Sequence, residues 1–310
     1  MRTLQLFALF VVLGFATGCK GAAPLPPKAI ELNRAGVEAL EQGDLETADA
    51  RFALALEYNP RFVEALVNQG LVELQRGNFR RARQLLGRAL RLNPDVAQPH
   101  HGLGVLAERE QRPDVAAKHY EDALKVDPGF AASRANLARL LFEAGRFEHA
   151  RVQFKRLTEV APDDASGHVG LVETLLQLDR RSEADAALAR ARGRFPEDEK
   201  LQILEARRQM RLGRFDSAVA LLTPLARARD EIAVRALGFL GTAELARSRP
   251  RFAVGAAERA LALDPEDPVG VFVMAAALSA LSDPGAPAWV ARADRLAPGA
   301  RKNIEGLAAR

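Results

Sequence analysis

Five prolines recur along the chain at a constant interval, and this regularity constrains the fold more than any other feature of the sequence. Each one lies 34 residues after the one before: Pro60, Pro94, Pro128, Pro162 and Pro196. Since proline makes up about 5% of residues in average proteins, such a run does not arise by chance. A fixed interval of this size is typical of repeat architectures, in which each unit packs on its neighbours.

Other residue types keep the same interval. Small residues stand at Ala48, Ala82, Ala116, Ala150, Ala184 and Ala218, and four positions later come the large residues Phe52, Leu86, Tyr120, Phe154, Leu188 and Leu222. Two helices cross closely only where a side chain is small, and a bulky neighbour fills the remaining gap. Gly43, Gly77, Gly145 and Gly213 are spaced by 34 residues or by twice that interval, and glycine commonly follows the last residue of a helix.

This pattern resembles the tetratricopeptide repeat (TPR) family, whose units are 34 residues long. The eighth position of a unit is small in that family, and here it is Gly36, Gly70, Gly104, Ala138, Ala206, Gly241 and Ala275, with Val172 as the exception. The resemblance implies an all-α protein, a right-handed superhelical solenoid of about eight helix–turn–helix repeats. The repeats cover 29–298 and begin near residues 29, 63, 97, 131, 165, 199, 234 and 268. Residues 299–310 are expected to form a capping helix.

The first residues have the layout of an export signal. Arg2 precedes an apolar run from Leu4 to Phe15 that is too short to span a bilayer. The next residues, Ala16-Thr17-Gly18-Cys19, resemble the lipobox of bacterial lipoproteins, although that family prefers leucine where Ala16 stands. The resemblance implies a signal peptide over 1–18 and acylation of Cys19, the only cysteine of the chain. The alternative is a secreted or periplasmic protein whose cysteine is incidental.

The residue after the cysteine of a lipoprotein directs its sorting, and Lys20 implies the outer membrane with the chain on the periplasmic side. Residues 19–28 are rich in proline and are expected to form a lipidated tether. The inner membrane remains an alternative destination.

Catalytic and metal-binding patterns are not found in the sequence. The five histidines are His100, His101, His119, His149 and His168, and none has a metal-ligand spacing. Adjacent helical residues point about 100° apart, so His100 and His101 are expected not to bind one ion together. The 44 basic and 40 acidic residues alternate, which is typical of a solvated surface and not of a nucleic-acid-binding stripe. We therefore expect no catalytic site, no metal, no cofactor and no nucleic-acid partner.

The TPR resemblance implies that residues of the first helix of each repeat line a concave groove that binds a partner protein. The positions that correspond to that groove are Val37, Leu40, Val67, Leu71, Leu74, His101, Val105, Arg139, Phe142, Arg207, Arg211 and Arg235. The first half of this set is mostly apolar, which favours an apolar partner segment. The alternative is that these side chains only fill space between helices.

The function expected is a protein-binding scaffold that is anchored in the outer membrane and assists an envelope complex. TPR lipoproteins of this kind resemble the pilotins of type IV pilus secretins and scaffolds of motility or polysaccharide export. A second possibility is an adaptor that regulates a cell-wall synthase or hydrolase, and a third is an enzyme.

Overall fold

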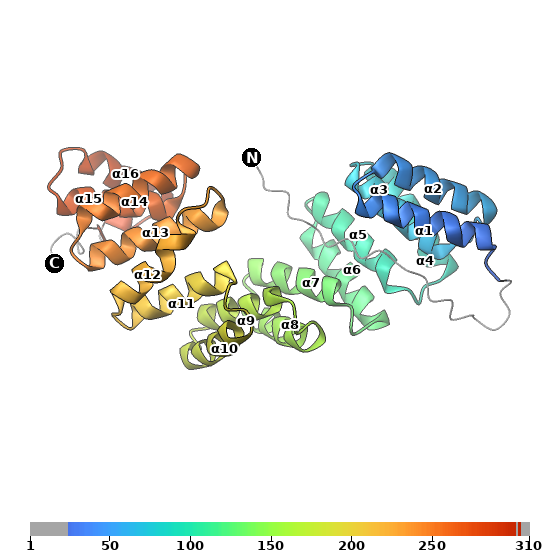
Figure 1. The fold of residues 1–310 in the computed structure, drawn as a ribbon, viewed down its shortest axis with the longest axis horizontal. Coiled ribbons are helices and arrows are strands. Elements are labelled where there is room, and N and C mark those ends of the chain that lie inside the picture. The colour runs from blue at the N-terminus through green and yellow to red at the C-terminus, as the bar shows by residue number, and fades with distance from the viewer. Residues whose placement is uncertain (1–23, 302, 305–310) are drawn as a thin grey trace. The chain divides into compact units, whose positions relative to one another are not determined.

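The structure, a computed structural model, describes residues 24–301, 303 and 304. These residues form sixteen α-helices that follow one another in pairs (Figure 1). The first helices of the pairs, called helix A, are α1 (Pro27–Glu41), α3 (Val63–Gln75), α5 (Ala97–Arg109), α7 (Ala131–Glu143), α9 (Ala165–Gln177), α11 (Glu199–Arg211), α13 (Glu231–Ala246) and α15 (Pro268–Ala280). The second helices, called helix B, are α2 (Leu45–Tyr58), α4 (Phe79–Leu92), α6 (Pro113–Val126), α8 (Phe147–Val160), α10 (Arg181–Arg194), α12 (Phe215–Leu225), α14 (Pro250–Leu263) and α16 (Ala286–Leu296).

The described chain divides into two compact units between Leu178 and Asp179. In the first unit α1 packs on α2, α3 on α4, α5 on α6 and α7 on α8. In the second unit α11 packs on α12, α13 on α14 and α15 on α16. The predicted all-α class with about eight paired repeats is confirmed. Within the described residues, no helix combines the length and the apolar character that a membrane span requires.

The helix ends follow from local sequence. Asn59, Asn93 and Asp127 adopt extended backbone directly before a proline, which ends helix B, because a residue before proline avoids the helical region. The sixth repeat lacks this proline and has Asp230 in its place. The Asp230 carboxylate accepts a hydrogen bond of 2.9 Å from the amide of Ala233 and so caps the start of α13.

One residue in the turn between helix A and helix B has a positive φ in every repeat. Four of these residues are the glycines that the sequence predicts at this place, with φ between 72° and 82°: Gly43, Gly77, Gly145 and Gly213. The other four are Gln111 (φ 59°), Asp179 (φ 54°), Ser248 (φ 57°) and Ser282 (φ 54°). The repeat geometry therefore imposes the left-handed conformation even on residues whose Cβ disfavours it.

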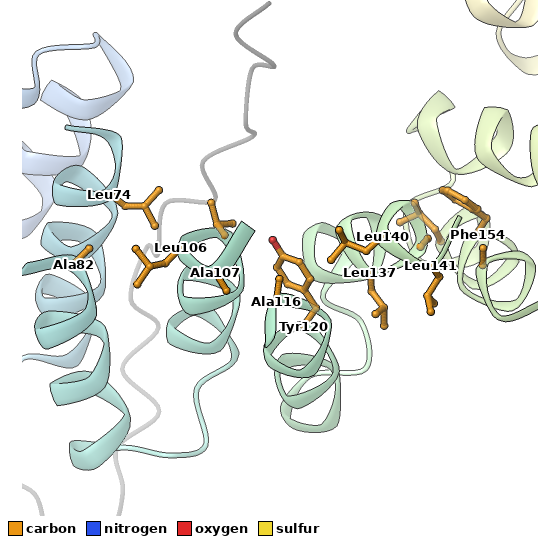
Figure 2. Close-up of a cluster of buried hydrophobic side chains, with 14 residues drawn as sticks. Leu74, Ala82, Leu106, Ala107, Ala116, Tyr120, Leu137, Leu140, Leu141 and Phe154 are labelled. Carbon is orange, nitrogen blue, oxygen red and sulfur yellow. The ribbon is translucent and has the colours of Figure 1, made fainter. Parts of the chain in front are cut away.

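The core between helices depends on the pairing of small and bulky residues that the sequence predicts. Tyr120 of α6 is fully buried and belongs to a cluster that extends from Leu74 to Phe154 (Figure 2). Its ring lies against Gly104 of α5, where an added Cβ would be 2.5 Å from Cε1 of Tyr120. In the same way a Cβ on Gly36 would lie 2.6 Å from the ring of Phe52. The glycines thus set how closely the two helices of a repeat approach.

The predictions for the two ends are tested only in part. Helix α1 begins at Pro27, two residues inside the segment expected to be a tether, because proline is accommodated in the first turn of a helix. Of residues 299–310, Ala300, Arg301, Asn303 and Ile304 are helical, and Ile304 is fully buried against the last repeat. Residues 1–18 and Cys19 lie outside the described residues.

Candidate protein-binding surface

The apolar groove residues predicted from the sequence are buried in the repeat packing. Their side chains are at most 7% exposed: Val37, Leu40, Val67, Leu71, Leu74 and Val105. They belong to core clusters, since Val37 packs with Phe52 and Leu71 packs with Leu86. The expectation of an open apolar strip is therefore wrong, because neighbouring helices already cover these side chains.

Several polar side chains of helix A remain exposed. In the first unit the last residue of each helix A is exposed, and these residues are Glu41, Gln75, Arg109, Glu143 and Gln177. They occupy equivalent positions of successive repeats. The TPR resemblance assigns this thirteenth position to the groove too, so the signal was present in the sequence. We call these five residues the helix-A row.

A buried polar network lies beside this row in the third and fourth repeats. The Tyr120 hydroxyl donates a hydrogen bond of 2.5 Å to Oε1 of Glu108, and Nδ2 of Asn136 donates one of 3.2 Å to the same hydroxyl. Arg139 forms an ion pair with the other oxygen of Glu108 and a second one, at 2.9 Å, with Glu143. Residues from α5, α6 and α7 are thereby joined through hydrogen bonds that connect to the exposed Glu143.

The surroundings of Tyr120 and Arg139 keep the phenol neutral and the guanidinium positively charged. Burial raises the pKa of Tyr120, and the neighbouring Glu108 carboxylate raises it further, so the phenol stays protonated. Burial alone would lower the pKa of Arg139, but the carboxylates of Glu108 and Glu143 outweigh that effect and raise it. Arg139 is thus already balanced by two carboxylates, and the group of Glu108, Arg139 and Glu143 has a net charge of −1 at neutral pH.

His101, predicted to face a partner, packs inside the protein. Its Nδ1 is 3.0 Å from Oγ of Ser133 on α7, and its ring lies 5.3 Å from Phe130 in an edge-on arrangement and 5.5 Å from Tyr120. Burial lowers the pKa of His101 to about 4, so the imidazole is neutral at neutral pH. His101 therefore contacts α6, α7 and the residue before α7 within the chain, and its contact with a partner stays a prediction.

The remaining predicted residues have partners within the chain. Phe142 is half-buried, with its ring 5.3 Å from that of Phe147 on α8. In the second unit Arg207 lies over the ring of Phe239 on α13 at 5.3 Å, and Arg211 pairs with Asp185 on α10 at 2.5 Å. Arg207 and Arg211 therefore engage different helices. Arg235 is half-buried on α13.

One cluster was missed by the sequence reasoning. His100 of α5 lies beside His119 and Asp122 of α6, a group whose side chains have the chemistry of metal ligands. Sequence spacing compares residues of one helix, whereas these three come together only because α5 packs on α6. The spacing of His119 and Asp122, one helical turn apart, was the available signal.

The fold resembles solved repeat structures at low sequence identity. The Cut9–Hcn1 hetero-tetramer of the APC/C matches with a TM-score of 0.64 and 14% identity, over 90% of this chain and 55% of that chain. This chain therefore spans about half the length of that relative. A tetratricopeptide repeat protein from Parabacteroides merdae matches with a TM-score of 0.57 and 16% identity, over 80% of this chain and 98% of that one.

A third similar structure is PilW, described as a widely conserved type IV pilus biogenesis factor. It matches with a TM-score of 0.56 and 19% identity, over 67% of this chain and 97% of that one. At these identities the likeness shows the fold alone. No curated protein matches the sequence.

Protein-family comparison agrees with the period and with the helix pairs. One tetratricopeptide repeat family matches residues 33–97, 68–131 and 203–268, and a second matches 107–168. The matches to the first family alone cover more than half of the 310 residues. The chain belongs to the tetratricopeptide repeat family.

Proposed function

We propose that this protein is a non-enzymatic scaffold that binds a partner protein through the helix-A row, Glu41, Gln75, Arg109, Glu143 and Gln177. The observation that carries the proposal is the exposure of one polar side chain at the same position of five successive repeats. A stack of repeats that presents one position per unit offers an extended binding surface. The apolar groove positions of the same helices are buried, whereas the polar side chains of the row are accessible.

The network beneath the row favours a rigid, preorganised surface. Arg139 holds Glu143 from one side and Glu108 from the other, so the Glu143 carboxylate is oriented before a partner arrives. Preorganisation of this kind reduces the entropy that binding must overcome. Since Glu41 and Glu143 are acidic and Arg109 is basic, the row and the Glu108–Arg139 pair together have a net charge of −1. We infer a partner segment with basic and amide side chains.

The proposed location is the cell envelope, with Cys19 acylated in the outer membrane and the repeats on the periplasmic side. The support is the export signal and lipobox-like sequence over residues 1–19. The shared fold with PilW is compatible with a role in assembling an envelope machine such as a pilus secretin, a motility apparatus or a polysaccharide exporter.

Site-specific photocrosslinking in the native cell tests this proposal. A photoreactive residue placed at Gln75 or Glu143 is expected to crosslink the full-length protein to one and the same envelope protein, identified by mass spectrometry. Matched positions on helix B are Val152 and Arg156 of α8, whose side chains are 52% and 53% exposed. They are expected to give no such crosslink.

Capture of the partner only from α8, or from none of the four positions, overturns the proposed binding surface. A partner from the type IV pilus machinery would assign the protein to pilus assembly. A partner from another envelope complex would support the scaffold role and contradict the pilus assignment.

A further inference from the structure

Three side chains with metal-binding chemistry meet on the third repeat, apart from the helix-A row. They are His100 of α5 and His119 and Asp122 of α6. Each offers one ligand atom, and all three atoms lie within 4.8 Å of one another. All three residues are half-buried.

The helix pair brings these residues together. His119 and Asp122 are three positions apart on α6, so they lie on one face of that helix. His100 comes from α5, which packs on α6, and its ring centroid is 6.3 Å from that of His119. The cluster therefore joins the two helices of a single repeat inside the first unit.

Each of the two imidazoles has a nitrogen atom that forms no hydrogen bond with the described part of the chain. Nδ1 of His100 and Nδ1 of His119 are both buried, and neither has a hydrogen-bond partner among the described residues. A buried polar atom without a partner costs about 1–3 kcal/mol, so such atoms need an explanation. A ligand bound within the cluster would fix both rings.

The protonation states suit a cation. Burial lowers the pKa of His100, and burial together with the charge of a protonated His100 lowers the pKa of His119. These shifts favour the neutral form of both imidazoles. The hydrogen bond from Lys125 lowers the pKa of Asp122, whose carboxylate is ionised. Neutral imidazole and ionised carboxylate are the forms that bind metal ions.

We propose that His100, His119 and Asp122 form a binding site for a divalent first-row transition metal, of which Zn²⁺ is the representative. Two imidazole nitrogens and one carboxylate oxygen favour such an ion over Mg²⁺ or Ca²⁺, which prefer oxygen ligands. Three protein ligands leave a coordination position for water. The metal links α5 to α6 through its ligands and stabilises the third repeat.

The geometry requires a small closing movement. Zinc bonds of about 2.0–2.2 Å place tetrahedral ligand atoms about 3.3–3.6 Å apart. The three ligand atoms here lie within 4.8 Å of one another, so they must approach more closely to bind the ion. Asp122 is bound to Nζ of Lys125 at 2.7 Å, and the Lys125 side chain is 72% exposed and free to rotate away. Lys118 and Arg112 lie near enough to His119 to oppose a cation, so we expect specific but not extreme affinity.

Metal titration of the full-length, tag-free protein tests the site after chelator treatment. Isothermal titration with Zn²⁺ is expected to show one saturable site, and thermal unfolding to shift to higher temperature as zinc is added. Co²⁺ is expected to give the visible absorption of a low-symmetry nitrogen and oxygen site. Asp122→Asn, which keeps the shape of the side chain, is expected to weaken zinc binding at least tenfold, and His100→Ala with His119→Ala to abolish it.

The matched control is His149→Ala, at an exposed histidine of α8 outside the cluster. This variant is expected to bind zinc like the wild type. Circular dichroism checks that every variant is folded. The proposal is overturned if the folded wild type binds no zinc, or if Asp122→Asn and the double histidine variant bind it as tightly as His149→Ala does.

Discussion

Gly104 and Tyr120 are in such close contact that a Cβ at Gly104 would lie 2.5 Å from Cε1 of the Tyr120 ring. Because Tyr120 is fully buried and held by Glu108 and Asn136, the ring cannot move aside. We expect Gly104→Leu to destabilise the protein by about 1–3 kcal/mol through overpacking. The urea midpoint of unfolding, followed by circular dichroism, measures this loss.

The control for that variant is Gly87→Ala on α4, where the added Cβ would be 3.5 Å from an Arg91 side-chain nitrogen, an ordinary contact. This change is expected to be neutral or to stabilise by up to about 1 kcal/mol, because alanine favours helix. An unchanged midpoint for Gly104→Leu would show that the helix crossing is not set by this contact.

A substitution at the turn residue Gln111 is expected to stabilise the protein, in contrast to Gly104→Leu. Its φ of 59° lies in the left-handed region, which costs a residue with a Cβ about 1–2 kcal/mol. Gln111→Gly is therefore expected to stabilise the protein by about 0.5–1 kcal/mol, after the greater entropy of glycine in the unfolded chain is subtracted.

Gly77 occupies the equivalent turn of the second repeat with φ 82° and no neighbour within 4 Å of an added Cβ. Gly77→Ala should therefore be destabilising purely through backbone strain. Thermal or urea unfolding measures the change in stability that Gln111→Gly and Gly77→Ala each produce. Equal stability of Gln111→Gly and wild type would mean that the strain at this turn is relieved elsewhere.

The buried phenol of Tyr120 predicts a loss of stability at alkaline pH. The pKa of Tyr120 is raised in the folded state, while an unfolded tyrosine ionises near pH 10. Stability from this group is therefore full below about pH 10 and falls by about 1.4 kcal/mol per pH unit above it. The chain has two tyrosines, so in Tyr58→Phe the tyrosinate absorbance reports Tyr120 alone.

In that variant we expect the tyrosinate signal to appear together with the loss of helical circular dichroism and not before it. Tyr120→Phe, the matched variant, should be less stable at neutral pH because Glu108 loses a donor, and its stability should depend less on pH above 10. Ionisation of Tyr120 in the folded protein near pH 10 would contradict the burial of its hydroxyl.

The predicted membrane anchor is an acyl modification of Cys19. Cys19→Ser is expected to abolish incorporation of labelled palmitate and to release the protein from the membrane fraction, because each buried methylene of an acyl chain contributes about 0.8 kcal/mol. Thr17→Ser, a conservative change two residues earlier, should leave labelling intact. Labelling of Cys19→Ser at the level of wild type would exclude lipidation at this residue.

The sequence determined the repeat, its period and the first residue of most helix A segments. Six of the eight helix A segments begin at the predicted residues 63, 97, 131, 165, 199 and 268. These boundaries depend on residues near them in the chain: a proline that ends helix B and a turn residue that ends helix A. The pairing of small and bulky residues was also readable, because both members lie within one repeat.

The tertiary structure alone decided which side chains remain accessible. The family position of Leu71 places it on the groove side of helix A, but its exposure depends on Leu86 and Leu103 from neighbouring helices, which cover it. The same holds for Arg139, whose charge is balanced by Glu108 of the preceding repeat. His100 and His119 share no sequence spacing of a metal site and meet only where α5 packs on α6. Local sequence sets the conformation of each helix, whereas accessibility, charge balance and ligand clusters depend on contacts between helices, which no short stretch of sequence encodes.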